Sequence, residues 1–143
     1  MFDRPIRDMM DPGKALTLPP ETAVRAAAEA MSDRGTGAAM VVDGERLIGI
    51  FTERDALFRV IARGLDPAST PVSMVMTHNP QTVGPKDSFG YALVLMQEGG
   101  YRHAPVVEND KPIGIVSSRS AMDPDLEEFV SEANRRKHMR MGN

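Results

Sequence analysis

Apolar residues recur along this chain with two different spacings, and the order of those spacings predicts secondary structure. Two groups of four have the i, i+3, i+4, i+7 spacing of one helical face: Val24, Ala27, Ala28 and Met31, and Phe89, Ala92, Leu93 and Met96. Pro20 and Pro85 precede these helices, and Gly35 and Gly100 fit their ends. The pattern therefore predicts two helices of similar length in corresponding places.

Short apolar runs after each helix predict a pair of strands. The runs cover residues 38–42 and 47–51 in the first half, and 104–107 and 113–116 in the second. Asp43-Gly44 between the first two runs favours a hairpin turn, and Asn109-Asp110 takes the same place in the second half. A further helix is predicted over residues 55–63, while Pro124 shortens its counterpart. With the extended segments that precede the helices, each half reads β-α-β-β-α.

The two halves are copies of one another. Residues 17–57 align with 82–122 without a gap, and 13 of the 41 pairs are identical. Composition alone would give roughly two or three identities, so the chain contains a duplicated module. We place the first repeat at residues 1–64, a linker at 65–71, the second repeat at 72–123 and a tail at 124–143. Because one unit would leave a sheet face exposed, we expect an α/β (α+β) fold with the repeats packed sheet to sheet about a pseudo-two-fold axis.

The tail has a helical pattern of its own. Leu126, Phe129, Val130 and Ala133 follow helical spacing, which predicts a C-terminal amphipathic helix. Packing on the chain's own body or on a dimer mate is the favoured interpretation. A nucleic-acid or lipid contact through the basic residues 135–140 is the weaker alternative, because acidic residues upstream balance them.

Composition excludes several classes of function. Among 143 residues there are no cysteines, so disulfides, thiolate catalysis and cysteine zinc sites are absent, and the three histidines share no ligand spacing. A net charge of −3 argues against nucleic acid as a partner. No apolar run approaches the roughly 20 residues of a membrane span, and the first residues lack a signal peptide's apolar run, so we expect a cytoplasmic protein without membrane contact. No nucleophile-base pair, metal set or Walker-type loop indicates an enzyme.

Thr52-Glu-Arg-Asp55 carries the clearest candidate chemistry and allows two interpretations. An aspartate can accept from both ribose hydroxyls of a nucleotide, and a threonine hydroxyl at a helix N-terminus suits an anion. The same Thr-x-x-Asp before an apolar run is also a helix capping box. From the residues alone the capping box is the favoured interpretation, and the two roles are compatible.

The chain resembles the tandem CBS domain pair, or Bateman module, over about residues 5–123. The resemblance is carried by segments that occur in both repeats: the Met-ending 6–10 and 72–76, the Pro-ending 16–20 and 81–85, the strands 39–43 and 103–108, and Gly49-Ile-Phe-Thr-Glu-Arg-Asp55. It implies a regulatory or sensory module, not an enzyme, that binds AMP, ADP, ATP or S-adenosylmethionine as ligand, with no obligatory cofactor. It also implies a homodimer and an unknown regulated protein as partner.

The resemblance further implies one complete ligand site shared by the repeats. Thr52, Arg54 and Asp55 of the first repeat would hold ribose and phosphate opposite Arg102 and His103 of the second. Thr82 and Val83 would contact the base through backbone groups and packing. The second cleft, with Ser117 and Ser120 facing Thr36, Gly37 and Ala38, lacks both the acid and the bases, so we expect it to be empty or weak. The alternative is a dimerisation or protein-docking module that binds no nucleotide.

Overall fold

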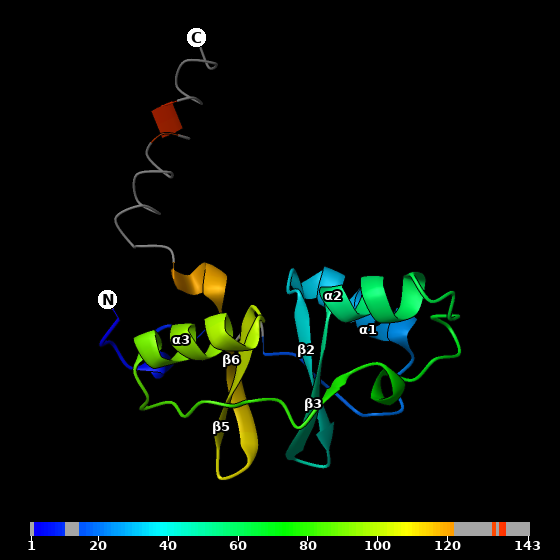
Figure 1. Ribbon diagram of the computed structural model, residues 1–143, viewed down its shortest axis with the longest axis horizontal. Helices are drawn as coiled ribbons and strands as arrows, with labels where there is room; N and C mark the ends of the chain where they lie inside the picture. Colours follow the sequence, from blue (N-terminus) through cyan, green and yellow to red (C-terminus); the bar gives the residue numbers. More distant parts are fainter. Residues whose placement is uncertain (1, 11–14, 122–132, 134, 137–143) are drawn as a thin grey trace.

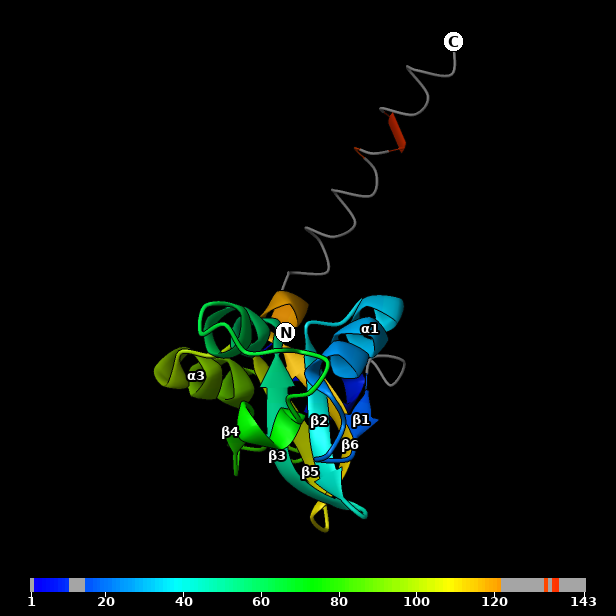
Figure 2. The same cartoon turned by 90° about the vertical axis from the view of Figure 1, so that its right-hand side faces the viewer.

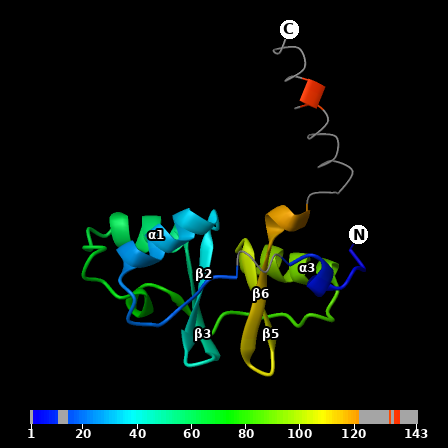
Figure 3. The same ribbon diagram turned by 180° about the vertical axis from the view of Figure 1, so that it is seen from behind.

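The computed structural model describes residues 2–10, 15–121, 133, 135 and 136. Two units stand side by side, each with its strands toward the middle of the molecule and its longest helix on the outer side (Figures 1 and 3). Figure 2 shows helix α1 (Val24–Arg34) and helix α3 (Phe89–Gly99) on opposite flanks of the strands. None of the described helices is long and apolar enough to cross a membrane.

The first unit contains a four-stranded sheet in the order β1-β2-β3-β4. Its strands are β1 (Thr17–Leu18), β2 (Ala38–Asp43), β3 (Arg46–Thr52) and β4 (Thr77–His78). Strand β1 is parallel to β2, and the other two pairs are antiparallel. The β2–β3 hairpin was predicted correctly except for its turn: Asp43 pairs with Arg46, so Gly44 and Glu45 form the loop and Gly44 has φ +63°.

The second unit repeats this plan with a smaller sheet. Strands β5 (His103–Glu108) and β6 (Lys111–Ser117) form an antiparallel hairpin. Asn109 and Asp110 occupy its loop at φ +54° and +65°, a region that these two residue types tolerate better than most. In place of a strand equivalent to β1, a single parallel bridge joins Val83 to Val106.

The helices follow the prediction with two corrections. Helix α1 buries Val24, Ala27 and Met31, but Ala28 is exposed and Ala30 packs against the core instead. The helix predicted at 55–63 begins earlier, as one α-turn, α2 (Glu53–Asp55), and continues as a π-helix, η3 (Ala56–Ile61). Its counterpart is a short 3-10 turn, η5 (Ser118–Ala121).

The short segments that open each sequence repeat pack in the opposite unit. Ile6, in the 3-10 turn η1 (Ile6–Asp8), is fully buried in the core of the second unit. Val72, in the 3-10 turn η4 (Val72–Met74), and Met76 are buried in the core of the first. The exchange means that each folded unit contains residues from both sequence repeats.

The two sheets meet face to face, as predicted. A small buried cluster joins Ala38, Met40 and Ile50 of the first unit to Ile115 of the second. At the hairpin tips, Leu47 N–H donates to the Asp110 carbonyl at 3.3 Å and Lys111 pairs with Glu45 at 2.7 Å.

Of the predicted tail helix, Ala133, Arg135 and Arg136 are described and are helical, while Leu126, Phe129 and Val130 lie outside the described residues.

Candidate functional site

Equivalent loops of the two repeats make the same contact at the end of the molecule opposite the hairpin tips. The Glu53 N–H donates to the Gly37 carbonyl at 2.9 Å, and the Ser118 N–H donates to the Arg102 carbonyl at the same distance. Glu53 and Ser118 are separated by the repeat period, as are Gly37 and Arg102. In both units the duplication therefore fixes the start of the last helical turn against the residue that precedes the first strand of the hairpin.

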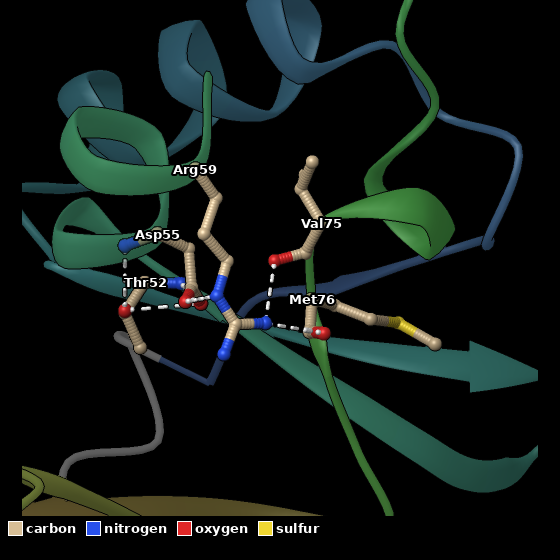
Figure 4. A network of polar contacts seen from close by, with 5 residues as sticks. All are labelled: Thr52, Asp55, Arg59, Val75 and Met76. Carbon is tan, nitrogen blue, oxygen red and sulfur yellow. Dashed lines mark hydrogen bonds and ion pairs between the residues drawn. The ribbon is translucent and has the colours of Figure 1, made fainter. Parts of the chain in front are cut away.

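Thr52 and Asp55 form the capping box that their spacing predicted (Figure 4). The Asp55 Oδ2 atom accepts from the Thr52 N–H at 3.0 Å and lies 3.2 Å from the Thr52 hydroxyl. The Asp55 N–H donates to that hydroxyl at 3.3 Å. The hydroxyl donor of Thr52 is thus directed to Asp55, and two of the first three helix N–H groups, those of Glu53 and Asp55, are already paired. An anion at this corner would therefore depend on basic side chains.

Arg59 is a neighbour of Asp55 that the sequence interpretation did not include. Its Nε atom lies 3.5 Å from Asp55 Oδ1, and its Nη1 atom donates to the carbonyls of Val75 and Met76 at 3.3 and 3.1 Å (Figure 4). The Asp55 side chain is 9% exposed and that of Arg59 is 48% exposed. The i, i+4 spacing of an acid and an arginine was a visible signal, but nothing in the sequence connected it to residues 75 and 76.

Residues of the two repeats meet directly beside this helix start. The guanidinium of Arg54 lies 5.5 Å from the ring centre of Phe58 and donates to the Gly100 carbonyl at 3.4 Å. A methyl group added at Gly37 would lie 3.0 Å from Glu53 Oε1 and 3.4 Å from His103 Cε1. The structure therefore brings Glu53 and Arg54 of the first repeat to residues 100–103 of the second, whereas Asp55 turns toward Thr52 and Arg59.

Among the predicted phosphate ligands, His103 has a pKa that its surroundings shift. Burial lowers the pKa of its imidazole, the Glu53 carboxylate opposes that shift, and the Arg102 guanidinium adds to it. Arg102 itself is exposed at the surface. At neutral pH the neutral form of His103 is therefore favoured, and Arg102 carries the fixed positive charge of the pair.

The predicted base contacts differ in availability. The Val83 side chain is 2% exposed in the core, its N–H donates to Pro105 at 3.0 Å and its carbonyl accepts from Val107 at 2.9 Å. The side chain of Thr82 is partly exposed.

In the second predicted cleft, the Thr36 hydroxyl donates to the Ala38 carbonyl at 3.4 Å and Ser117 pairs with His103 between β5 and β6. The side chain of Ser120 lies outside what the structure describes.

Among the described residues there is no group of three or more His, Asp or Glu side chains that could hold a metal ion. The side chains at the junction of the repeats instead include a buried carboxylate and an exposed one, two exposed arginines and a partly buried imidazole. Such a set suits hydrogen bonding to a polar organic ligand with an anionic group.

A family model and the relatives of this chain both identify the CBS domain. The CBS domain model matches residues 6–62 and again 72–124. The CBS domain-containing protein CBSCBSPB3 of Arabidopsis thaliana is 43% identical over 104 residues, which are 72% of this chain and 19% of that relative. The chain thus spans about a fifth of the length of the first curated relatives it matches.

Two solved structures share the fold. An uncharacterised conserved protein from Pyrococcus horikoshii is 29% identical, with a TM-score of 0.78 and coverage of 85% of this chain and 92% of that one. A CBS domain protein from Pyrobaculum aerophilum, complexed with AMP, is 23% identical, with a TM-score of 0.77 and coverage of 90% and 99%. At that identity the second likeness concerns the fold alone. The duplicated sequence, the paired units and the two family matches show that this chain belongs to the CBS domain family and carries two CBS domains in tandem.

Proposed function

We propose that this CBS pair is a regulatory module that binds an adenosine-containing ligand, AMP, ADP, ATP or S-adenosylmethionine, where the two repeats meet. The observation that supports it most is the convergence at one corner of groups from both repeats. Glu53 and Arg54 of the first repeat lie beside Gly100 and His103 of the second, and Asp55 is adjacent in the chain. A ligand that contacts both repeats gains affinity only in their assembled arrangement, which is the requirement for a sensor.

The chemistry of each group suggests its role. The Asp55 carboxylate would accept from the ribose hydroxyls, and charge-assisted bonds of this kind contribute about 1.5–3 kcal/mol each. Arg102 and Arg54, both exposed, would hold phosphate, with His103 as a neutral donor or acceptor beside them. Thr82 and Val83 would contact the base, with Thr82 as the polar contact because the Val83 backbone is paired within the sheet.

The second cleft is proposed to be empty or weak. Ser120 stands where the first repeat has Asp55, and Gly37 and Ala38 stand where the second has Arg102 and His103. A serine offers a neutral hydrogen bond in place of charge-assisted ones, and Gly37 and Ala38 supply no counterpart of the Arg102 guanidinium or the His103 imidazole. One ligand per chain is therefore expected.

Self-association is the specific alternative, and one observation favours it. Helix η3 exposes Leu57, Phe58 and Ile61 at 50%, 52% and 69%, and α3 exposes Tyr91 and Val94 at 51% and 52%. Exposed apolar groups of this kind commonly mark protein interfaces. We propose a homodimer through these helices. Dimerisation and ligand binding are compatible, but a chain that only dimerises or docks a regulated protein would not respond to nucleotide.

A thermal-shift screen separates these functions. Purified protein is heated alone and with AMP, ADP, ATP, S-adenosylmethionine or NAD, each at saturating concentration. A ligand at 100 times its Kd adds about 2.7 kcal/mol of stability, which raises the midpoint by several degrees in a domain of this size. A shift with one or more adenosine ligands supports the proposed function, and no shift with any of the five favours the docking module.

A further inference from the structure

Arg59 links the carboxylate proposed for ribose to a segment far away in sequence. One side of its guanidinium lies 3.5 Å from Asp55 Oδ1, and the other donates to the carbonyls of Val75 and Met76 at 3.3 and 3.1 Å (Figure 4). These carbonyls end the segment 72–76, which packs in the core of the first unit. The three contacts together are called the Arg59 bridge below.

The hydrogen-bonding capacity of Asp55 is nearly filled by the contacts described. A carboxylate has about four acceptor sites, two on each oxygen. Oδ2 faces the N–H and the hydroxyl of Thr52 at 3.0 and 3.2 Å, and Oδ1 faces Arg59. A ribose diol brings two donors, so both can be accepted by Asp55 only if one of these contacts gives way. The Arg59 contact is the longest of the three and its side chain is half exposed, so it is the one that yields most readily.

The backbone around Arg59 is unusual at the same place. Arg59 lies in the π-helix η3, where the Ala62 N–H donates to the Leu57 carbonyl five residues earlier at 2.9 Å. Single π-turns are rare and occur often at functional sites. On the other side of the bridge, Met76 is followed by β4 and, six residues after Met76, by Thr82. A change at Arg59 can therefore reach the segment proposed to contact the base.

We propose that the ribose hydroxyls of the ligand and Arg59 compete for Oδ1 of Asp55, so that ligand binding opens the Arg59 bridge and loosens residues 72–78. The inference rests on the proposed function, because it concerns the same carboxylate. It gives the module an internal response to ligand binding: the Asp55 carboxylate bonds either to the ligand or to Arg59, and the order of residues 72–78, at the start of the second repeat, depends on which of the two it holds.

Arg59→Gln tests the competition, with Arg63→Gln as the matched control because Arg63 is an exposed arginine one turn further along the chain. Isothermal titration calorimetry measures AMP and S-adenosylmethionine, and 2′,3′-dideoxy-AMP serves as the ligand without hydroxyls. R59Q should bind the two ribose ligands about threefold to tenfold more tightly, the range of one net hydrogen bond. Dideoxy-AMP should show no such gain, and R63Q should match the wild type.

Hydrogen exchange of the peptide covering residues 72–78 provides the second readout. AMP should increase its exchange in the wild type, and R59Q should show the increased exchange without ligand. A merely structural role for Arg59 would weaken binding in R59Q and would leave exchange in the wild type unchanged or lower when AMP is added. Either result overturns the competition.

The failures of the two proposals are distinguishable. If none of AMP, S-adenosylmethionine, ADP and ATP binds the wild type or R59Q, the proposed function is overturned together with the competition. If a ligand binds the wild type and R59Q binds it equally or less well, only the competition is overturned. If R59Q does not fold, Arg59→Lys replaces it, since lysine keeps the charge but cannot fork between Asp55 and two carbonyls; tighter ribose binding by R59K supports the proposal and equal or weaker binding overturns it.

Discussion

Met76, which ends the opening segment of the second sequence repeat, packs directly on Gly49 in strand β3 of the first. A methyl group added at Gly49 would overlap the Met76 sulfur and would lie 2.8 Å from its terminal carbon. Gly114 has the same relationship to Met10, whose sulfur would lie 2.6 Å from an added methyl group. The Gly-Ile motif and the Met-ending segments of the two repeats are thus complementary parts of one contact, made twice.

Gly49→Ala should destabilise the protein by about 1–3 kcal/mol, the usual cost of overpacking a core. Urea unfolding followed by circular dichroism measures the change. Gly84→Ala is the control, because a methyl group there would lie 3.5 Å from the nearest atom, Asp87 Oδ2, and Gly84 does not have a positive φ. Equal stability of the wild type and Gly49→Ala would show that Met76 moves aside at little cost.

Asp55→Asn should weaken binding of the adenosine ligand by roughly tenfold or more, because it exchanges charge-assisted acceptors for a neutral one. Asparagine keeps an oxygen for the Thr52 N–H, so the helix start is better preserved than in Asp55→Ala. Calorimetry gives the affinities, and Asp33→Ala on the exposed face of α1 is the control for loss of one acid. Unchanged affinity in Asp55→Asn would remove Asp55 from the ribose site.

Stability should depend on His103 at mildly acidic pH. Burial lowers the pKa of His103 in the folded chain, so below its ordinary value of about 6.5 the unfolded chain binds the proton more readily. Unfolding free energy should therefore fall as pH falls from about 7 through that value toward the lowered pKa. His103→Gln should lose this part of the pH dependence, while His78→Gln, at an exposed position, should retain it. The two variants are compared by urea unfolding across the range, and identical pH profiles would refute the assignment.

The stoichiometry of binding tests the inequality of the two clefts. Calorimetry at ligand concentrations that saturate the first site should give one adenosine ligand per chain, because Ser120 and the Gly37-Ala38 loop lack an acid and a cation. Two equally tight ligands per chain would contradict this. The measurement is made on wild-type protein and so does not depend on the folding of a variant.

Ile61→Glu should weaken self-association, because it places a charge at the most exposed apolar side chain of η3. Analytical ultracentrifugation over a range of concentrations compares it with the wild type and with Ala26→Glu, an exposed position on α1. A dimer that withstands Ile61→Glu would place the interface elsewhere.

The sequence was sufficient for most of the fold because the same pattern occurs twice. Helices α1 and α3 and both hairpins follow directly from apolar spacing, and the Thr52–Asp55 capping box follows from its motif. Local spacing does not reveal which unit a short segment joins, so the exchange of residues 6–10 and 72–76 became visible only in the structure.

The candidate site was less predictable for a related reason. Arg59 has the spacing of an ordinary surface ion pair, and its contacts with Val75 and Met76 depend on the exchanged segment. Likewise, Glu53 and not Asp55 lies beside Gly37 and His103. The capping box directs the Asp55 side chain back to Thr52, and this orientation of the helix start leaves Glu53 facing the second repeat. Residues that contact their own repeat could be inferred, and contacts across repeats required the assembled fold.

The contacts at the hairpin tips determine how the units can move. Glu45 pairs with Lys111 and Leu47 with Asp110 at the hairpin tips, while Gly37 of the first repeat lies beside His103 of the second near the other end of the strands. If the contacts at the hairpin tips are kept, a ligand that separates Gly37 from His103 would rotate one sheet relative to the other about the tips. Because η3 and α3 lie away from the hairpin tips (Figure 1), a small opening beside Arg102 would displace these two elements more than the tips, and they carry the exposed apolar side chains proposed above for dimerisation.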